Sequence, residues 1–269
     1  MPRPRRNIWA LAGLLSLLPG MAMACRQALV LALDVSLSVD AFEFRLQREG
    51  LARALEDRHV ASAMIGTGAD PVELAVFEWT GQYNQDVLVD WTVIDSRATL
   101  SQIASTLRTR ERSLRPGLTG LGAAMLFGRD MLMTRRHCTA LTLDISGDGV
   151  SNNGVHPALV RPEMEAAGIT VNGLVIEPEP DSLAVSHFFN DHVITGPGAF
   201  AETIHSFDSY AEAIHRKLLR EIMPSLSEGA PGPRREARQI PRPDAPADKP
   251  QGGVTNMRGH ASHLPVAPL

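Results

Sequence analysis

The sequence predicts an α/β protein built on a doubly wound, mostly parallel sheet. Segments with the pattern of strands alternate with segments of helical periodicity between positions 25 and 224. The segment 28–33 is continuously apolar, which is typical of a central parallel strand buried on both faces. A short polar turn at 81–84 separates two further strand segments, which indicates one antiparallel hairpin. These observations predict a six-stranded sheet with helices on both faces and one antiparallel edge strand.

The individual elements follow from periodicity and from breaker residues. Strands are predicted at 28–33, 72–79, 87–93, 139–145 and 169–176, with a short edge strand at 193–195. Helices are predicted at 39–56, 96–107, 120–133, 157–167, 182–190 and 206–223. Gly168 is expected to end the fourth of these helices and Pro224 the last. A region of about 200 residues is expected to form one domain.

The first residues have the pattern of a secretory signal peptide. Three arginines precede the apolar core 8–18, and Ala22-Met23-Ala24 forms a small-x-small cleavage site before Cys25. The apolar stretch is too short to be a membrane span. We therefore expect 1–24 to be removed and the chain to be exported, periplasmic or secreted, without a transmembrane span. A lipid anchor on Cys25 is the alternative, although Ala22 stands where lipoprotein signals usually carry leucine.

The composition changes from position 225 onward. This segment is rich in proline, glycine and charge and almost lacks large apolar residues, so 225–269 is predicted to be a disordered tail. The tail carries a net charge of +2, whereas 25–224 carries −9. An acidic domain argues against nucleic acid as a partner, because binding to phosphates requires a basic face. The tail is interpreted as a solvated segment, with weak attachment to an anionic surface as the alternative.

Three separate segments place oxygen-bearing side chains at strand ends or helix starts. They are Asp34-x-Ser36-x-Ser38 after the first strand, Thr119 at the start of an alanine-rich helix, and Asp148 after the strand 139–145. Loops that follow neighbouring parallel strands flank one crevice in an open α/β sheet. Carboxylates and hydroxyls without histidine or cysteine suit Mg²⁺, Mn²⁺ or Ca²⁺ and not Zn²⁺.

Each segment also has a structural interpretation. Ser38 or Asp40 would cap the helix that follows it, and Thr119 would cap its own helix. Asp148 and Gly149 together would form a turn. The case for a metal site therefore depends on the three segments occurring together.

In this order the three segments resemble the metal-ion-dependent adhesion site of von Willebrand factor type A domains. The resemblance covers about 25–224. The sequences at 46–50, 145–153 and 194–200 resemble a bacterial subfamily of exported proteins of this type, whose function is unknown. The resemblance implies a Rossmann-like sheet with strand order 3-2-1-4-5-6.

The resemblance also implies roles for individual residues. Ser36, Ser38 and Thr119 would coordinate the cation directly or nearly so, and Asp34 and Asp148 would act directly or through water. A glutamate or aspartate of a protein partner would complete the coordination. An ion whose charge is only partly neutralised by its ligands stays positive and attracts such an acid.

One departure from the family pattern concerns the second acid of the site. Ser146-Gly147 precede Asp148, where many relatives have threonine immediately before the aspartate. Asp144 is the competing candidate, but it lies inside the predicted strand, where a buried charge needs its own partner. Asp148 is therefore the preferred residue.

The implied strand order predicts a disulfide. It places the first and fourth strands side by side, with Cys25 and Cys138 at their N-terminal ends. Adjacent strands lie about 4.8 Å apart, which is within the range that a disulfide accepts. An exported chain with two cysteines is expected to form a Cys25–Cys138 bridge.

The resulting functional hypothesis is an exported, divalent-cation-dependent module that binds an acidic group on another protein. The alternatives are a Mg²⁺-dependent phosphotransferase or phosphatase using Asp34, and a scaffold with a structural metal. The enzyme is disfavoured because Ser36 stands where a second acid is required and because Lys217 and Lys249 are the only lysines available to bind phosphate. We therefore expect the chain not to be an enzyme.

Overall fold

The computed structural model describes residues 25–67, 70–177, 179 and 182–222. Within them the strands are β1 (Cys25–Asp34), β2 (Val72–Trp79), β3 (Gln85–Val93), β4 (Cys138–Gly147), β5 (Ile169–Ile176) and β6 (Ala201–Ile204). The predicted signal peptide and tail lie outside the described residues, and so does Pro224.

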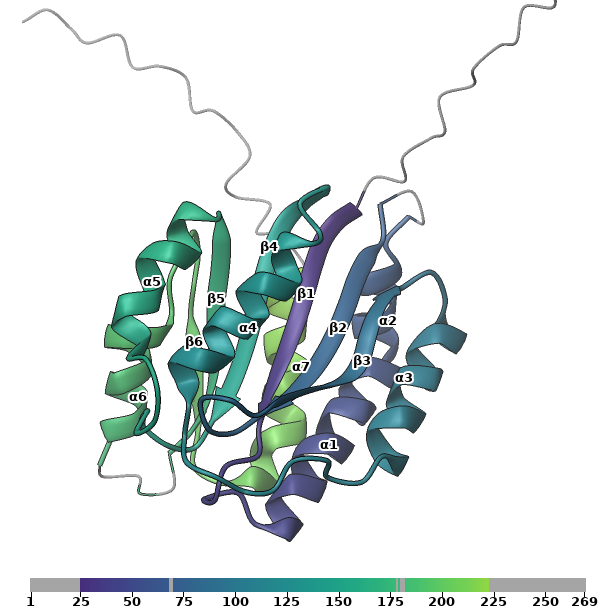
Figure 1. Ribbon diagram of the computed structural model, residues 1–269. Coiled ribbons are helices and arrows are strands. Elements are labelled where there is room, and N and C mark those ends of the chain that lie inside the picture. Colours follow the sequence, from purple (N-terminus) through teal and green to yellow (C-terminus); the bar gives the residue numbers. More distant parts are fainter. Residues whose placement is uncertain (1–24, 68–69, 178, 180–181, 223–269) are drawn as a thin grey trace, which may run out of the picture. The chain divides into compact units, whose positions relative to one another are not determined.

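The strands form one six-stranded sheet with the order β3-β2-β1-β4-β5-β6 (Figure 1). Every neighbouring pair is parallel except β2 and β3, which are antiparallel. The predicted fold class, strand order and antiparallel edge strand are thereby confirmed. In this order β1 and β4 are the central strands, so the loops that follow them lie side by side at the carboxyl edge of the sheet.

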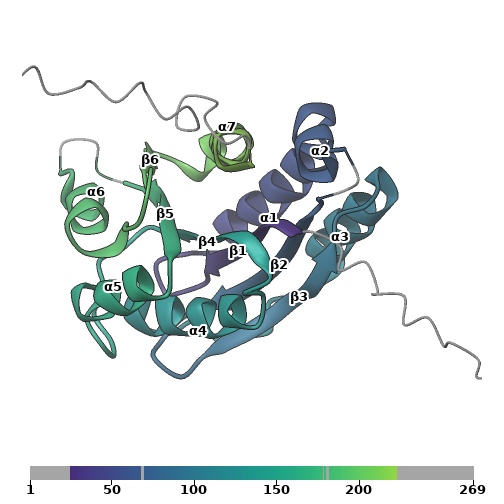
Figure 2. The same cartoon turned by 90° about the horizontal axis from the view of Figure 1, so that it is seen from above.

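Helices cover both faces of the sheet, as Figure 2 shows from above. One face packs against α1 (Ala41–Glu56), α2 (Arg58–Ile65), α3 (Arg97–Thr109) and α7 (Tyr210–Ile222). The other face packs against α4 (Leu121–Met133), α5 (Pro157–Ala166) and α6 (Ala184–Phe188). No helix among the described residues is long and apolar enough to cross a membrane.

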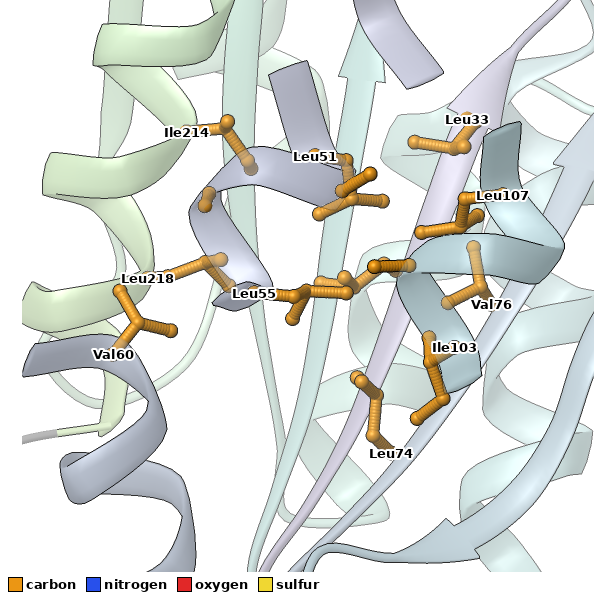
Figure 3. Close-up of a cluster of buried hydrophobic side chains, with 14 of the residues drawn as sticks. Leu33, Leu51, Leu55, Val60, Leu74, Val76, Ile103, Leu107, Ile214 and Leu218 are labelled. Atoms are coloured by element: carbon orange, nitrogen blue, oxygen red, sulfur yellow. The ribbon is translucent and has the colours of Figure 1, made fainter. Parts of the chain in front are cut away.

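Strand alternation divides the core between these two layers. Leu29, Leu31 and Leu33 of β1 lie in the cluster under α1, α3 and α7, and the residues between them lie in the cluster under α4 and α5. Figure 3 shows the first cluster, in which Leu51 and Leu55 of α1 lie between the sheet and Leu218 of α7. Because β1 is buried on both faces, its apolar run is continuous.

Three expectations about individual elements were wrong or incomplete. The predicted edge strand 193–195 is wrong: Val193 ends a π-helix (Phe189–Val193), and Thr195 makes only an isolated bridge to Val171. Gly196 and Gly198 have positive φ, so the chain turns there and pairs with β5 later, as β6.

Helix α2 was not predicted. Asp57 is its N-cap and also ends α1. A 3₁₀ turn (Phe207–Ser209) precedes the closing helix α7.

A buried ionic cluster joins α7 to the sheet. Lys217 Nζ lies 2.5 Å from both Asp144 Oδ1 of β4 and Glu221 Oε1, and these side chains are nearly or fully inaccessible to solvent. The pKa of Glu221 is raised to about 8, mainly by burial and also by the Asp144 charge, although Lys217 lowers it. Burial lowers the pKa of Lys217, but the two carboxylates outweigh it, so the pKa of Lys217 is raised and the ammonium stays charged.

The predicted disulfide joins Cys25 to Cys138 at the amino edge of the sheet. The two residues are register partners of β1 and β4, and their Cα atoms are 4.4 Å apart. This edge is opposite to the one where the loops after β1 and β4 meet, because both strands run from the disulfide toward those loops.

Candidate metal centre

The site begins with Asp34, the last residue of β1. Its side chain is fully buried, and its Oδ1 accepts a hydrogen bond of 2.7 Å from the Ser36 N–H. Its Oδ2 is also buried and has no hydrogen-bond partner within the described structure. A buried carboxylate oxygen without a partner is costly, so Asp34 is suited to bind a cation.

Two serines connect Asp34 to the loop after β4. Ser36 Oγ lies 3.0 Å from Ser38 Oγ, and Ser38 Oγ donates a hydrogen bond of 2.6 Å to Asp148 Oδ1. Ser38 is free to do so because Asp40, and not Ser38, caps α1, in a capping box with Glu43. The structure therefore brings Asp34, Ser36, Ser38 and Asp148 into one contiguous group.

Thr119 comes from the loop before α4. Gly120 is the N-cap of that helix, and no side chain caps it, so Thr119 does not have the capping role considered above. The Thr119 N–H donates to Asn152 Oδ1 (2.9 Å), and the Thr119 carbonyl accepts from the Asn152 N–H (3.0 Å). A methyl group added at Gly149 would lie 3.6 Å from Thr119 Oγ1. The loop after β4 therefore holds Thr119 beside Gly149, the residue that follows Asp148. We call Asp34, Ser36, Ser38, Thr119 and Asp148 the oxygen cup.

The residues that depart from the family pattern before Asp148 belong to the end of β4. β4 continues through Ser146 and Gly147, which pair with β5. A methyl group at Gly147 would lie 3.2 Å from Asp34 Oδ2, so glycine leaves room at the unpaired oxygen. Asp144 is ion-paired with Lys217 of α7, and the hydrogen bonds of Ser36 and Ser38 among the described residues do not include it. Geometry therefore places Asp148, and not Asp144, in the oxygen cup; its role as a metal ligand stays a prediction.

Other residues that support the cup were not found from the sequence. Arg112 donates to the carbonyls of Val35 (3.1 Å) and Val39 (3.0 Å), which lie on either side of the two serines. Asn153 accepts from the Gln82 N–H (2.7 Å) and so ties the cup to the β2–β3 turn. Asn152 and Asn153 fall within the segment 145–153, which carries part of the family resemblance, whereas nothing in the sequence indicates the contacts of Arg112.

The electrostatics of the cup favour a cation. The pKa of Asp34 is raised to about 7, mainly by burial and also by the negative charge of Asp148, although the hydrogen bonds from Ser36 lower it. Burial likewise raises the pKa of Asp148. Two carboxyl groups that are costly to ionise alone are stabilised as anions by a divalent ion. With hydroxyl and carboxylate oxygens as donors, the cup fits a hard cation.

A second group of potential metal ligands lies at the opposite edge of the sheet. The ligand atoms of Cys25, Glu73, His137 and Cys138 all lie within 4.8 Å of one another. The two sulfur atoms are bonded to each other in the disulfide, and His137 Nε2 lies 2.8 Å from Glu73 Oε1. Because oxidised sulfur is a poor metal ligand, we assign the candidate centre to the oxygen cup.

Comparison with solved structures places the fold among von Willebrand factor type A domains. Proximal thread matrix protein 1 from the mussel byssus aligns with a TM-score of 0.55 and 12% identity, over 73% of this chain and 48% of that one. Another structure of that protein, with a zinc-occupied MIDAS motif, aligns with a TM-score of 0.54 and 16% identity, over 73% and 46%. The pilus adhesin SpaC from Lactobacillus rhamnosus GG aligns with a TM-score of 0.52 and 16% identity, over 74% and 30%.

A von Willebrand factor type A protein from Catenulispora acidiphila aligns with a TM-score of 0.51 and 15% identity, over 74% of this chain and 43% of that one. This chain thus spans less than half of these longer proteins, and at such low identity the likeness shows the fold alone. No curated protein sequence matches the chain. A family described as "Protein of unknown function (DUF1194)" matches residues 24–226. The chain therefore belongs to the DUF1194 family and has the fold of a von Willebrand factor type A domain.

Proposed function

We propose that this chain is an exported module that binds a protein partner through a divalent cation held in the oxygen cup. Asp34, Ser36, Ser38, Thr119 and Asp148 would hold the ion, and Mg²⁺ is the expected ion, with Mn²⁺ and Ca²⁺ as alternatives. The bound ion supplies a centre of positive charge that an Asp or Glu side chain of the partner can approach.

The observation that carries this proposal is the unpaired Oδ2 of Asp34. It is buried in a cup in which hydrogen bonds of 2.6–3.0 Å link Ser36, Ser38 and Asp148, and Gly147 leaves it room. A structural role alone would be expected to pair both carboxylate oxygens. An oxygen left without a protein donor suits a ligand that the protein does not itself provide.

Two further lines support the proposal. Structures with the same fold include one with a zinc-occupied MIDAS motif and a pilus adhesin. Export is supported by the signal-like first residues and by the Cys25–Cys138 disulfide, which is typical of oxidising compartments. The phosphotransferase alternative loses support because Lys217 is ion-paired in the buried cluster at α7.

Calorimetric titration with Mg²⁺, and separately with Mn²⁺, tests metal binding. We expect one ion per chain for the wild type and no binding heat for Asp34→Ala. The matched control is Asp191→Ala, which removes an exposed carboxylate outside the cup and is expected to bind like the wild type. Equal heats for all three proteins would remove the metal site.

A second measurement tests the functional role of the ion. Proteins of the envelope fraction are passed over the immobilised protein with Mg²⁺ and, in parallel, with a chelator. We expect a partner that is retained only with Mg²⁺ and only by proteins with Asp34. If the partner is retained equally with the chelator and by the Asp34→Ala variant, a metal-dependent interface is contradicted.

A further inference from the structure

Large apolar side chains are exposed around the oxygen cup. The described part of the chain exposes eight such side chains, and five of them lie on the loops of the cup or on segments directly joined to it: Leu37, Phe42, Tyr83, Leu118 and Val150. A single exposed apolar side chain is ordinary on a protein surface. Their concentration around one polar site calls for an explanation.

Three of these side chains each come from a different loop of the cup. Leu37 stands between the two serines and is 67% exposed, Leu118 directly precedes Thr119 and is 50% exposed, and Val150 follows Asp148 by two positions and is 42% exposed. We call Leu37, Leu118 and Val150 the apolar rim.

Backbone hydrogen bonds hold the rim together. The Leu37 N–H donates to the Gly117 carbonyl (2.8 Å), which joins the first loop to the second beside Leu118. The Thr119 carbonyl accepts from the Asn152 N–H (3.0 Å), which joins the second loop to the third near Val150. The rim residues are therefore fixed relative to the oxygen cup and do not sit on independent loops.

Metal binding alone does not require these residues. The rim side chains offer no oxygen to an ion, and they pack against no core cluster of the described structure. Covering these side chains removes apolar surface from water, which is favourable. Apolar surface around a desolvated charged contact is typical of a protein–protein interface.

We propose that the oxygen cup and the apolar rim together recognise a protein segment in which one acidic side chain is flanked by apolar side chains. This rests on the proposed function, because the acid is bound through the ion. The acidic side chain would meet the ion while its neighbours cover Leu37, Leu118 and Val150.

The charge of the domain favours this partner over a protein rich in acidic residues and over a second copy of the domain. The domain carries a net charge of −9, and Asp40 and Glu43 lie next to the first loop of the cup. A partner rich in acidic residues would be repelled everywhere except at the ion. A second copy of the same domain would bring another −9 and is disfavoured on the same ground.

Blocked tripeptides of the form N-acetyl-X-Asp-X-amide test the proposal on the full chain. After a titration that establishes metal binding, Leu-Asp-Leu, Gly-Asp-Gly and Leu-Asn-Leu peptides are titrated into the Mg²⁺-loaded protein. Leu-Asp-Leu is expected to bind about tenfold tighter than Gly-Asp-Gly, which is the effect of burying part of two leucine side chains. Leu-Asn-Leu is expected not to bind.

Variants then locate the apolar contribution. The triple change Leu37→Ser, Leu118→Ser and Val150→Ser is expected to make the Leu-Asp-Leu and Gly-Asp-Gly affinities equal. Leu37→Ser alone is expected to give part of that effect and serves if the triple variant is poorly folded. Leu159→Ser removes a leucine that is 70% exposed on α5 and is expected to leave the tenfold difference intact.

The outcomes separate the two proposals. A protein that binds no metal contradicts the proposed function, and this is seen before any peptide is added. If metal binds but the two aspartate peptides bind equally, or if Leu-Asn-Leu binds as well as Leu-Asp-Leu, the rim proposal alone is overturned. It is also overturned if light scattering shows a metal-dependent dimer that the triple variant abolishes, because the rim would then bind a second copy.

Discussion

Asp34 makes the stability of the folded chain depend on pH. Its pKa is raised from 3.8 to about 7, so the folded chain without metal keeps a proton there that the unfolded chain loses. Between these two pH values the folded state binds more protons, so the Asp34 contribution to stability falls as the pH rises from about 4 to 7. A divalent ion offsets this loss because it stabilises the ionised carboxylate.

The Asp34→Asn change follows from this argument. At pH 8 without metal, we expect the variant to be at least as stable as the wild type, because it lacks the buried charge. We also expect it to lose the rise in melting temperature that Mg²⁺ gives the wild type. Thermal melts at pH 5 and 8, with and without Mg²⁺, measure both effects. A variant that is destabilised at pH 8 and still stabilised by Mg²⁺ would contradict this account of Asp34.

A substitution at Gly147 tests the role of the unpaired Oδ2 of Asp34. It leaves every predicted metal ligand in place. Gly147→Ala would put a methyl group 3.2 Å from Asp34 Oδ2, where the ion is expected to bind. Overpacking by such a change typically costs about 1–3 kcal/mol. Because the methyl group would crowd the position of the ion, this cost falls on the metal-bound state, and we expect Mg²⁺ affinity to fall by about tenfold or more. Calorimetric titration of the folded variant measures this affinity.

The matched control for Gly147 lies in the same loop region. Gly149→Ala would place its methyl group 3.6 Å from Thr119 Oγ1, an ordinary contact distance. We expect this variant to retain most of the wild-type affinity. Equal affinities for the two alanine variants would show that Gly147 does not govern access to Asp34.

At the scale of elements, α7 is attached to the sheet by charge as well as by apolar packing. Lys217→Met would leave Asp144 and Glu221 buried without their cation, which typically costs about 3–5 kcal/mol. Arg216→Met on the same helix breaks ion pairs with the half-buried Glu202 and the exposed Glu212, both open to solvent on the Arg216 side, and is expected to cost under about 1 kcal/mol. Urea denaturation measures both, and similar losses would mean that the buried cluster adds no stability to α7.

The sequence predicted elements well where periodicity was strong and poorly where the chain turns at glycines. The bounds of β2 and β5 agree with prediction because their apolar runs end at clear breakers. The last strand was misplaced because Ala201–Ile204 is short and only half-buried, and its pairing depends on the turns at Gly196 and Gly198. Helix α2 was missed because Asp57 both ends one helix and begins the next.

The candidate site was predicted as a set of residues but not as a geometry. The oxygen cup consists of the five residues predicted from residue type and spacing, and the structure brings them together at the edge where β1 and β4 end. Their binding of an ion stays a prediction. The unpaired oxygen of Asp34, the room left by Gly147 and the contacts of Arg112 arise only in the folded chain. The apolar rim could not be predicted either, because the spacing of residues in the sequence does not show which apolar side chains are exposed.

At the scale of the whole molecule, the disulfide and the oxygen cup lie at opposite edges of the sheet. The bridge closes a loop with a sequence separation of 113, for which the chain-entropy model gives about 4–5 kcal/mol of stabilisation as an upper figure. Replacing both Cys25 and Cys138 by serine should therefore lower the free energy of unfolding by up to that amount. Mg²⁺ affinity should not change, and a matching fall in affinity would mean that the two edges are coupled.

The most direct test of the oxygen cup is a crystal of the protein soaked in Mn²⁺, with the ion located by its anomalous scattering. We expect one strong peak with side-chain oxygens of Asp34, Ser36, Ser38, Thr119 and Asp148 around it, the direct ligands at about 2–2.5 Å and the others linked through water. A cup without a peak, or a peak bound by other residues such as Glu73 and His137, would contradict the account.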